Sequence, residues 1–240
     1  MIDAETRGDA RWVTIDRPEK RNALHLEGWR RLGEELARAE AESRVAVLTG
    51  VEDVFCAGDD IAVIDGAESA AEVEALADAL YEAFWGIERL SVPVVAAVNG
   101  LAYGGGFELV CAADLAVAVD DAVLALPETT IGAYPPYAVE RVGDICGRKR
   151  LMELVLTGDP IDAETAHEWG LLNRVVEPGG LEPAVEAYVD RIGRSPKRAT
   201  ATARRFARST DGGARDRIRG ALSQLRRDEA CRAATRAFTE

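Results

Sequence analysis

The stretch Asn99–Asp114, NGLAYGGGFELVCAAD, joins an apolar segment typical of a strand to one typical of a helix. Three glycines, Gly104, Gly105 and Gly106, occupy the junction, and Glu108 follows two residues later. Glycines at such a junction let the backbone approach a ligand closely, and the first N–H groups of a helix have no partner within it. Free N–H groups suit an oxygen that gains negative charge during a reaction. The stretch therefore predicts part of a catalytic site.

Two other segments have a related pattern. In 55–61, FCAGDDI, a short apolar strand end runs into Gly58, and a turn there would leave the N–H of Asp59 free. Two free N–H groups, from Asp59 and Gly105, would form an oxyanion hole. In LPE at 126–128, a proline fixes Glu128 after a strand. Alone, Glu128 is typical of a solvated loop acid and a glycine triplet of a packing turn; the three segments in this order favour a site.

The rest of the chain alternates strand and helix patterns, which predicts an α/β fold. The apolar, β-branched runs predict strands at 12–15, 45–49, 93–98, 115–119 and 123–126. Apolar residues at helical spacing predict helices over 29–39 and 73–87 and between Asp162 and Gly170, with a helical chain from 181 onward. We expect an α/β core over 1–195 and a helical region over 196–240.

Composition excludes several classes of protein. The formal net charge of -13 over 240 residues argues against a nucleic-acid partner, because binding phosphates needs a basic surface. No apolar run approaches the roughly 18 residues of a membrane span, and the first residues lack an apolar targeting segment, so we expect a cytoplasmic protein without a membrane partner. The four cysteines are widely spaced, which favours buried thiols over disulfides or a metal site.

The acidic surface has two explanations. Only three of the 29 basic residues are lysines, at 20, 149 and 197. A lysine-poor, acidic surface is typical of proteins from salt-loving organisms, whereas an arginine-rich composition also arises from a GC-rich genome. Both explanations stay open.

Several segments together resemble the crotonase family, the enoyl-CoA hydratase/isomerase superfamily. The resemblance covers about residues 10–180, and its motifs are RPEKRNAL at 17–24, FCAGDDI at 55–61, NGLAYGGGFEL at 99–109, PE at 127–128, LTGD at 156–159 and GLLNRVV at 170–176. It implies a spiral of ββα turns with a C-terminal helical region that packs trimers, which can pair into hexamers. It also implies acyl-CoA thioester substrates and no metal or redox cofactor, since coenzyme A is part of the substrate.

The resemblance also implies roles for individual residues. The thioester oxygen would lie between the N–H groups of Asp59 and Gly105, so the side chain at position 59 is free to vary. Glu108 and Glu128 match the two acids of the hydratases: Glu108 would deprotonate the attacking water, and Glu128 would supply the Cα proton. Because two carboxyl groups near one apolar site do not both ionise cheaply, one should stay protonated. The expected substrate-binding residues are Arg21, Ala23, Ala57, Gly58, Asp60, Ile61, Gly104 and Tyr134.

Two segments depart from the hydratase pattern. Where hydratases carry a glycine-rich segment, this chain has Tyr134-Pro135-Pro136-Tyr137, whose tyrosines would either narrow the acyl pocket or repack the loop. Ile61-Ala62 lacks the basic residue that some relatives place near the CoA phosphates, and Arg21 or arginines of the C-terminal region would have to replace it. The leading expectation is an enoyl-CoA hydratase. Alternatives are an isomerase, a thioester hydrolase or a C–C lyase of the same family, and a non-catalytic RNA-binding relative.

Overall fold

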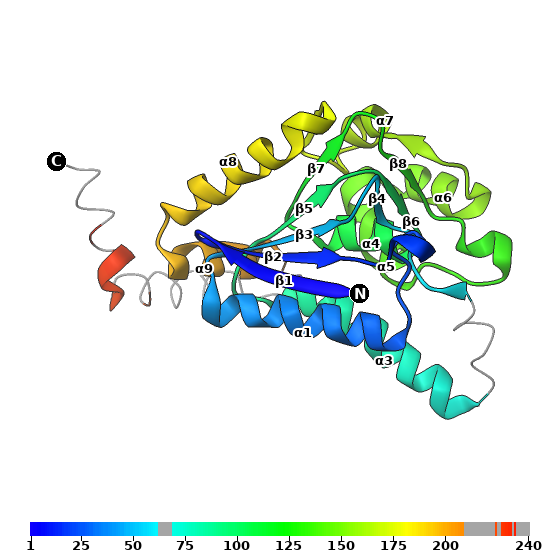
Figure 1. Cartoon of the computed structure of the whole chain (residues 1–240), viewed down its shortest axis with the longest axis horizontal. Helices are drawn as coiled ribbons and strands as arrows, with labels where there is room; N and C mark the ends of the chain where they lie inside the picture. The colour runs from blue at the N-terminus through cyan, green and yellow to red at the C-terminus, as the bar shows by residue number, and fades with distance from the viewer. Residues whose placement is uncertain (62–68, 209–223, 225–226, 232, 234–240) are drawn as a thin grey trace.

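Two β-sheets form the centre of the computed structural model, which describes residues 1–61, 69–208, 224, 227–231 and 233 (Figure 1). The six-stranded sheet has the order β1-β2-β3-β5-β7-β10, and all of its strands are parallel except the β1–β2 pair. Its strands are β1 (Ile2–Arg7), β2 (Ala10–Ile15), β3 (Val45–Gly50), β5 (Val94–Val98), β7 (Leu115–Val119) and β10 (Arg174–Val176). The four-stranded sheet is formed by β4 (Val54–Cys56), β6 (Leu101–Tyr103), β8 (Val123–Ala125) and β9 (Ile161–Asp162).

The chain moves between the two sheets in a repeating order. A strand of the large sheet is followed by a strand of the small sheet and then by a helix, as in β3–β4–α3 and β5–β6–α4. Because β4, β6 and β8 lie next to one another, the chain segments that follow them meet at one end of the small sheet. This is the expected spiral of ββα turns, and it brings together the three segments that the sequence analysis singled out.

Helices cover both faces of the large sheet. Figure 1 shows α1 on one side of it and α8 on the other. The α-helices are α1 (Leu26–Glu42), α3 (Ala70–Arg89), α4 (Gly105–Ala112), α5 (Pro136–Cys146), α6 (Arg148–Thr157), α7 (Ala163–Glu168), α8 (Leu181–Gly193) and α9 (Lys197–Ala207). Short 3-10 helices occupy Pro18–Lys20, Glu128–Ile131 and Pro178–Gly180.

The predicted strands and helices are confirmed up to residue 207, with small shifts of their ends, and the rest of the helical chain predicted from 181 onward lies mostly outside the described residues. All five residues of β5 are buried, as a strand covered on both faces requires. Asp162 caps α7 by accepting from the N–H of Thr165, and Gly170 after that helix has φ +80°. All four cysteines are buried, and Cys56, Cys111 and Cys146 are free thiols in the described structure. Strand β1 is not evident from the sequence, because its exposed, charged face conceals the strand pattern.

The first part of the expected C-terminal region packs on the core. Arg204 of α9 is buried and donates to the carbonyl oxygens of Ile87 (2.5 Å), Glu88 (3.0 Å) and Leu90 at the end of α3. Its Nε also donates to Asp114 at 2.6 Å. These bonds cap the C-terminus of α3. The boundary at 195–196 and a role in trimer packing stay predictions, and most of 209–240 lies outside the described residues.

Within the described part of the chain, no helix is both long and apolar enough to cross a membrane.

Candidate active site

The backbone N–H of Asp59 faces the start of α4. Leu24 pairs with this segment, donating to the carbonyl oxygen of Gly58 (2.8 Å) and accepting from the N–H of Asp60 (2.9 Å). Neighbouring N–H groups of an extended chain point to opposite sides, so the N–H of Asp59 points away from Leu24. Gly58, with φ +86°, lies against α4: a Cβ there would come within 2.9 Å of the nitrogen of Gly105.

Two free backbone donors therefore lie side by side. In the described structure, neither the N–H of Asp59 nor that of Gly105 has a hydrogen-bond acceptor. Gly105 is the first residue of α4, where an N–H has no partner within the helix. The two donors come from separate segments, as an oxyanion hole requires.

The three glycines of the triplet meet different requirements. Gly104 adopts φ +55°, and a Cβ there would lie 3.1 Å from Oε1 of Glu128. Gly105 lies against the ring of Trp29, because a Cβ at position 105 would come within 2.9 Å of a ring carbon. Gly106 lets α4 pack on β4, because a Cβ would overlap the carbonyl oxygen of Cys56 at 2.0 Å. Any side chain at Gly106 would push α4 away from β4.

Glu108 is held by the start of α5. Its side chain is buried, and Oε1 accepts from the N–H groups of Tyr137 (2.7 Å) and Ala138 (2.8 Å). These are the second and third residues of α5, whose N–H groups have no partner within the helix. The bonds fix one oxygen of the carboxyl group and leave the other for a ligand.

Glu128 lies on the other side of the triplet, without hydrogen bonds from its carboxyl group. It begins the 3-10 helix after β8, so Pro127 and the strand end position it as predicted. Both carboxyl oxygens are buried, and neither has a hydrogen-bond partner in the described structure. A buried carboxyl group without a donor is stable only in its neutral form or against a ligand.

The two acids have raised pKa values. Burial raises the pKa of Glu108 to about 8, against the effect of its two backbone hydrogen bonds, and the charge of Glu128 adds to the rise. Burial also raises the pKa of Glu128 to about 7, with a contribution from the charge of Asp59. Near neutral pH the pair therefore retains at least one proton. The pKa of about 8 already includes the two hydrogen bonds of Glu108, so the balance of burial and hydrogen bonding leaves the higher pKa on Glu108, although the bonds themselves favour its carboxylate.

This environment predicts a pH-dependent stability. The folded state holds the proton of Glu128 up to about pH 7, whereas an unfolded chain loses it near 4.5. Between these values the folded state binds more protons, so the free energy of unfolding falls as pH rises. Glu128→Gln removes this loss, and we expect its melting temperature to rise relative to the native protein from pH 4.5 to pH 7.5. A difference that is the same at both pH values would contradict the assignment.

The predicted substrate-binding segments lie together. Ala57 donates to the carbonyl oxygen of Arg21 (3.1 Å), so RPEKRNAL runs beside FCAGDDI. A residue not predicted from the sequence, buried Asn22, joins RPEKRNAL to the chain just before FCAGDDI by donating to the carbonyl oxygens of Val51 (3.2 Å) and Val54 (2.7 Å). Asp60 forms an ion pair with Arg17 at 2.8 Å. Ala23 is buried and Ile61 and Arg21 are exposed, so direct contacts of these residues with substrate stay predictions.

The tyrosines of the departing segment have different environments. Tyr137 is buried, packs against Phe84 and Trp85, and donates its hydroxyl to Glu88 at 3.0 Å. Tyr134 exposes 64% of its surface. Tyr137 is therefore part of the core within this chain, which agrees with the alternative that the loop is repacked. Whether Tyr134 contacts substrate stays a prediction.

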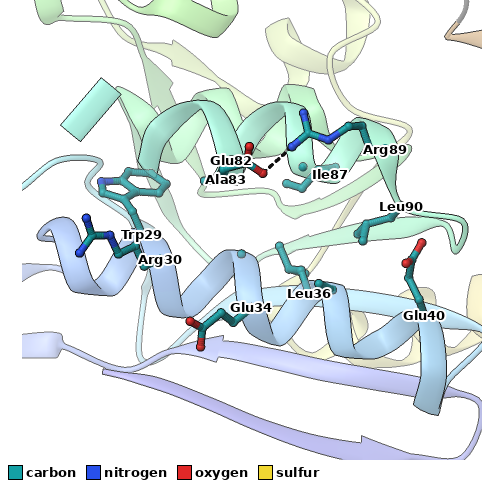
Figure 2. Close-up of a pocket in the computed structure, with 13 residues that line it drawn as sticks. Trp29, Arg30, Glu34, Leu36, Glu40, Glu82, Ala83, Ile87, Arg89 and Leu90 are labelled. Carbon is teal, nitrogen blue, oxygen red and sulfur yellow. Dashed lines mark hydrogen bonds and ion pairs between the residues drawn. The ribbon is translucent and has the colours of Figure 1, made fainter. Parts of the chain in front are cut away.

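Trp29 connects the site to a groove between α1 and α3 (Figure 2). The groove has a volume of about 460 Å³, and its lining includes Gly33 of α1 and Gly86 of α3. Figure 2 shows charged side chains at its edge, among them the ion pair of Glu82 with Arg89. Asp59, Glu108 and Glu128 do not line this groove.

No group of three or more histidine, cysteine, aspartate or glutamate side chains in the described ranges is arranged to hold a metal ion. The expectation that the reaction needs no cofactor stays a prediction.

Comparisons with known proteins agree on one family. Residues 7–228 match the family model described as enoyl-CoA hydratase/isomerase. A carnitinyl-CoA dehydratase of Proteus mirabilis is 37% identical over 214 residues, which cover 85% of this chain and 79% of that protein. An enoyl-CoA hydratase from Mycobacterium smegmatis superposes with a TM-score of 0.92 at 28% identity, over 99% of this chain and 95% of that one. An enoyl-CoA hydratase from Bacillus anthracis superposes with a TM-score of 0.91 at 27% identity, over 99% of this chain and 95% of that one.

Proposed function

Because the chain belongs to the enoyl-CoA hydratase/isomerase family, we propose that it adds water across the α,β double bond of an acyl-CoA thioester to give a 3-hydroxyacyl-CoA. Crotonase-family acyl-CoA hydratases and dehydratases catalyse this reaction in its two directions. The observation that carries the proposal is the position of two buried carboxyl groups, Glu108 and Glu128, beside two free N–H groups. An isomerase of the family typically needs only the acid that matches Glu128, so Glu108 favours hydration.

In this proposal the thioester oxygen accepts from the N–H groups of Asp59 and Gly105. These donors stabilise the negative charge that the oxygen gains as the enolate forms. They come from rigid backbone at the end of β4 and the start of α4, so they need no rearrangement during the reaction. The free N–H groups support this role because neither has an acceptor in the described structure, and an unpaired donor that is removed from water is costly unless a ligand accepts from it.

The two acids would move the protons. The carboxylate of Glu108 accepts a proton from water as the water oxygen bonds to Cβ, and the protonated carboxyl of Glu128 donates to Cα. Hydrogen bonding supports these roles, since Glu108 has two N–H donors that favour its carboxylate and Glu128 has none in the described structure. In dehydration the same steps run backwards: Glu128 takes the Cα proton and Glu108 protonates the leaving hydroxide.

The test is an assay with crotonyl-CoA. We expect the absorbance of the conjugated thioester to fall as 3-hydroxybutyryl-CoA forms, and to rise in the reverse assay. No change at any salt concentration in either direction would contradict the proposal. The relatives named carnitinyl-CoA dehydratase favour a second candidate, the dehydration of a 3-hydroxyacyl-CoA with a charged acyl group, so carnitinyl-CoA belongs in the same assay.

We also propose a homotrimer or homohexamer as the working assembly and the cytoplasm as its location, as in the resemblance described above. Light scattering of the purified chain tests the assembly.

A further inference from the structure

The side chain of Asp59 has a fixed position beside the proposed oxyanion hole. Its Oδ1 accepts from Nε1 of Trp29 at 2.8 Å. Trp29 is fully buried, and its ring lies 2.9 Å from the Cβ position at Gly105. The carboxyl group of Asp59 is therefore anchored next to the donor that α4 contributes. The proposed role in the hole uses only the N–H of Asp59, which leaves the purpose of this anchored acid unexplained.

The surroundings of this carboxyl group are acidic. Burial raises the pKa of Asp59 to about 6, against the hydrogen bond from Trp29, so the group is ionised at pH 8. Its charge in turn raises the pKa values of Glu108 and Glu128, which face it from α4 and from the 3-10 helix after β8. From β4, the group facing it is the buried thiol of Cys56, whose pKa burial raises to about 12.

No cation compensates these acids in the described part of the chain. Asp59 forms no ion pair there, although Arg17 lies close to this segment. Arg17 instead binds the next residue, Asp60, at 2.8 Å. Three carboxyl groups thus surround the place proposed for the reacting carbons, and only Asp59 has no part in the proposed proton transfers.

We propose that the carboxylate of Asp59 determines acyl specificity by repelling acyl groups that carry a negative charge. The site would accept acyl-CoA thioesters whose acyl part is neutral or cationic. This inference rests on the proposed function for the place of the acyl chain. Two like charges about 6 Å apart in a protein environment repel by enough to weaken binding on the order of a hundredfold.

The experiment measures binding of two saturated ligands that cannot be hydrated, butyryl-CoA and glutaryl-CoA, by titration calorimetry at pH 8. Asp59→Asn keeps an oxygen for Trp29 but removes the charge. We expect this variant to bind glutaryl-CoA at least about tenfold more tightly than the native protein, with butyryl-CoA changed less than about twofold. Glu164→Gln, which removes one charge from an exposed position on α7, should leave both affinities unchanged.

At pH 5, where Asp59, Glu108 and Glu128 are all protonated, the native protein should discriminate less between the two ligands, and Asp59→Asn at pH 8 separates the part due to Asp59. Trp29→Phe keeps a ring but removes the N–H donor, and should reduce the discrimination at pH 8. The proposal is overturned if Asp59→Asn changes both affinities equally, changes neither, or if neither ligand binds the native protein. If the native protein binds selectively but never hydrates crotonyl-CoA, the Asp59 inference stands and the proposed reaction fails.

Discussion

Glu128→Gln should lower the rate of crotonyl-CoA hydration by about 10²–10⁴-fold and leave the fold as stable as before, or more so. Glutamine has the shape of the neutral acid but no acidic proton to donate to Cα. The carboxyl oxygens of Glu128 are buried without partners in the described structure, so the substitution breaks no hydrogen bond of the described chain. Steady-state rates at saturating crotonyl-CoA and a thermal melt at pH 7.5 measure the two effects. A variant with native turnover would show that another group donates the proton.

Glu108→Gln provides a contrast to Glu128→Gln. Its amide oxygen can still accept from Tyr137 and Ala138, so α5 keeps its start, but the variant cannot take a proton from water. We expect a similar loss of turnover with little change in butyryl-CoA affinity. Glu164→Gln serves as the control for both, since its side chain is exposed on α7. A loss of turnover that is matched by a large loss of thermal stability would indicate a structural role for Glu108.

The parts of the site that the sequence predicted depend on local signals. Glycine at 58 and at 104–106 marks backbone that residues with a side chain rarely adopt or where a side chain would overlap a neighbour, and both glycine segments follow short apolar strands. Parallel strands then bring their ends to one place, so the spiral needs little beyond the order of strands. Gly105 and Asp59 therefore lie side by side as expected, and the strands and helices predicted between 12 and 207 are present, whereas α5, α6, β9 and β10 are not among those predicted.

The parts that the sequence analysis missed depend on contacts between distant segments. Trp29 has the spacing of a core residue on α1, and no local pattern indicates that its N–H meets Asp59, thirty residues away. The bonds from α5 to Glu108 likewise depend on how α5 packs, and the segment before it departs from the family pattern. Arg204 lies in a charged helical sequence that is typical of a surface residue, and only the tertiary structure shows that it binds the end of α3. Such pairings follow from the tertiary arrangement and leave no periodic signal.

Arg204→Ala should have the largest effect on stability, lowering the free energy of unfolding by about 3–5 kcal/mol. The side chain is only 5% exposed, and the variant leaves the carboxylate of Asp114 and the last carbonyl groups of α3 without this donor. For a chain of this size the melting temperature should fall by roughly 6–20 °C. Arg205→Ala is the matched control, because the neighbouring side chain is exposed and should change stability by less than about 0.5 kcal/mol.

The Arg204 comparison also tests whether α9 belongs to the folded core. If residues beyond 195 formed an independent region, the hydrogen bonds of Arg204 to the end of α3 would contribute little to the stability of the core. Arg204→Ala would then have the same melting temperature as Arg205→Ala. A single ammonium group cannot reach Asp114 and three carbonyl oxygens together. We therefore expect the melting temperature of Arg204→Lys to lie between those of the native protein and Arg204→Ala. A lysine variant as stable as the native protein would show that charge alone, without the forked geometry of arginine, holds α9 against α3.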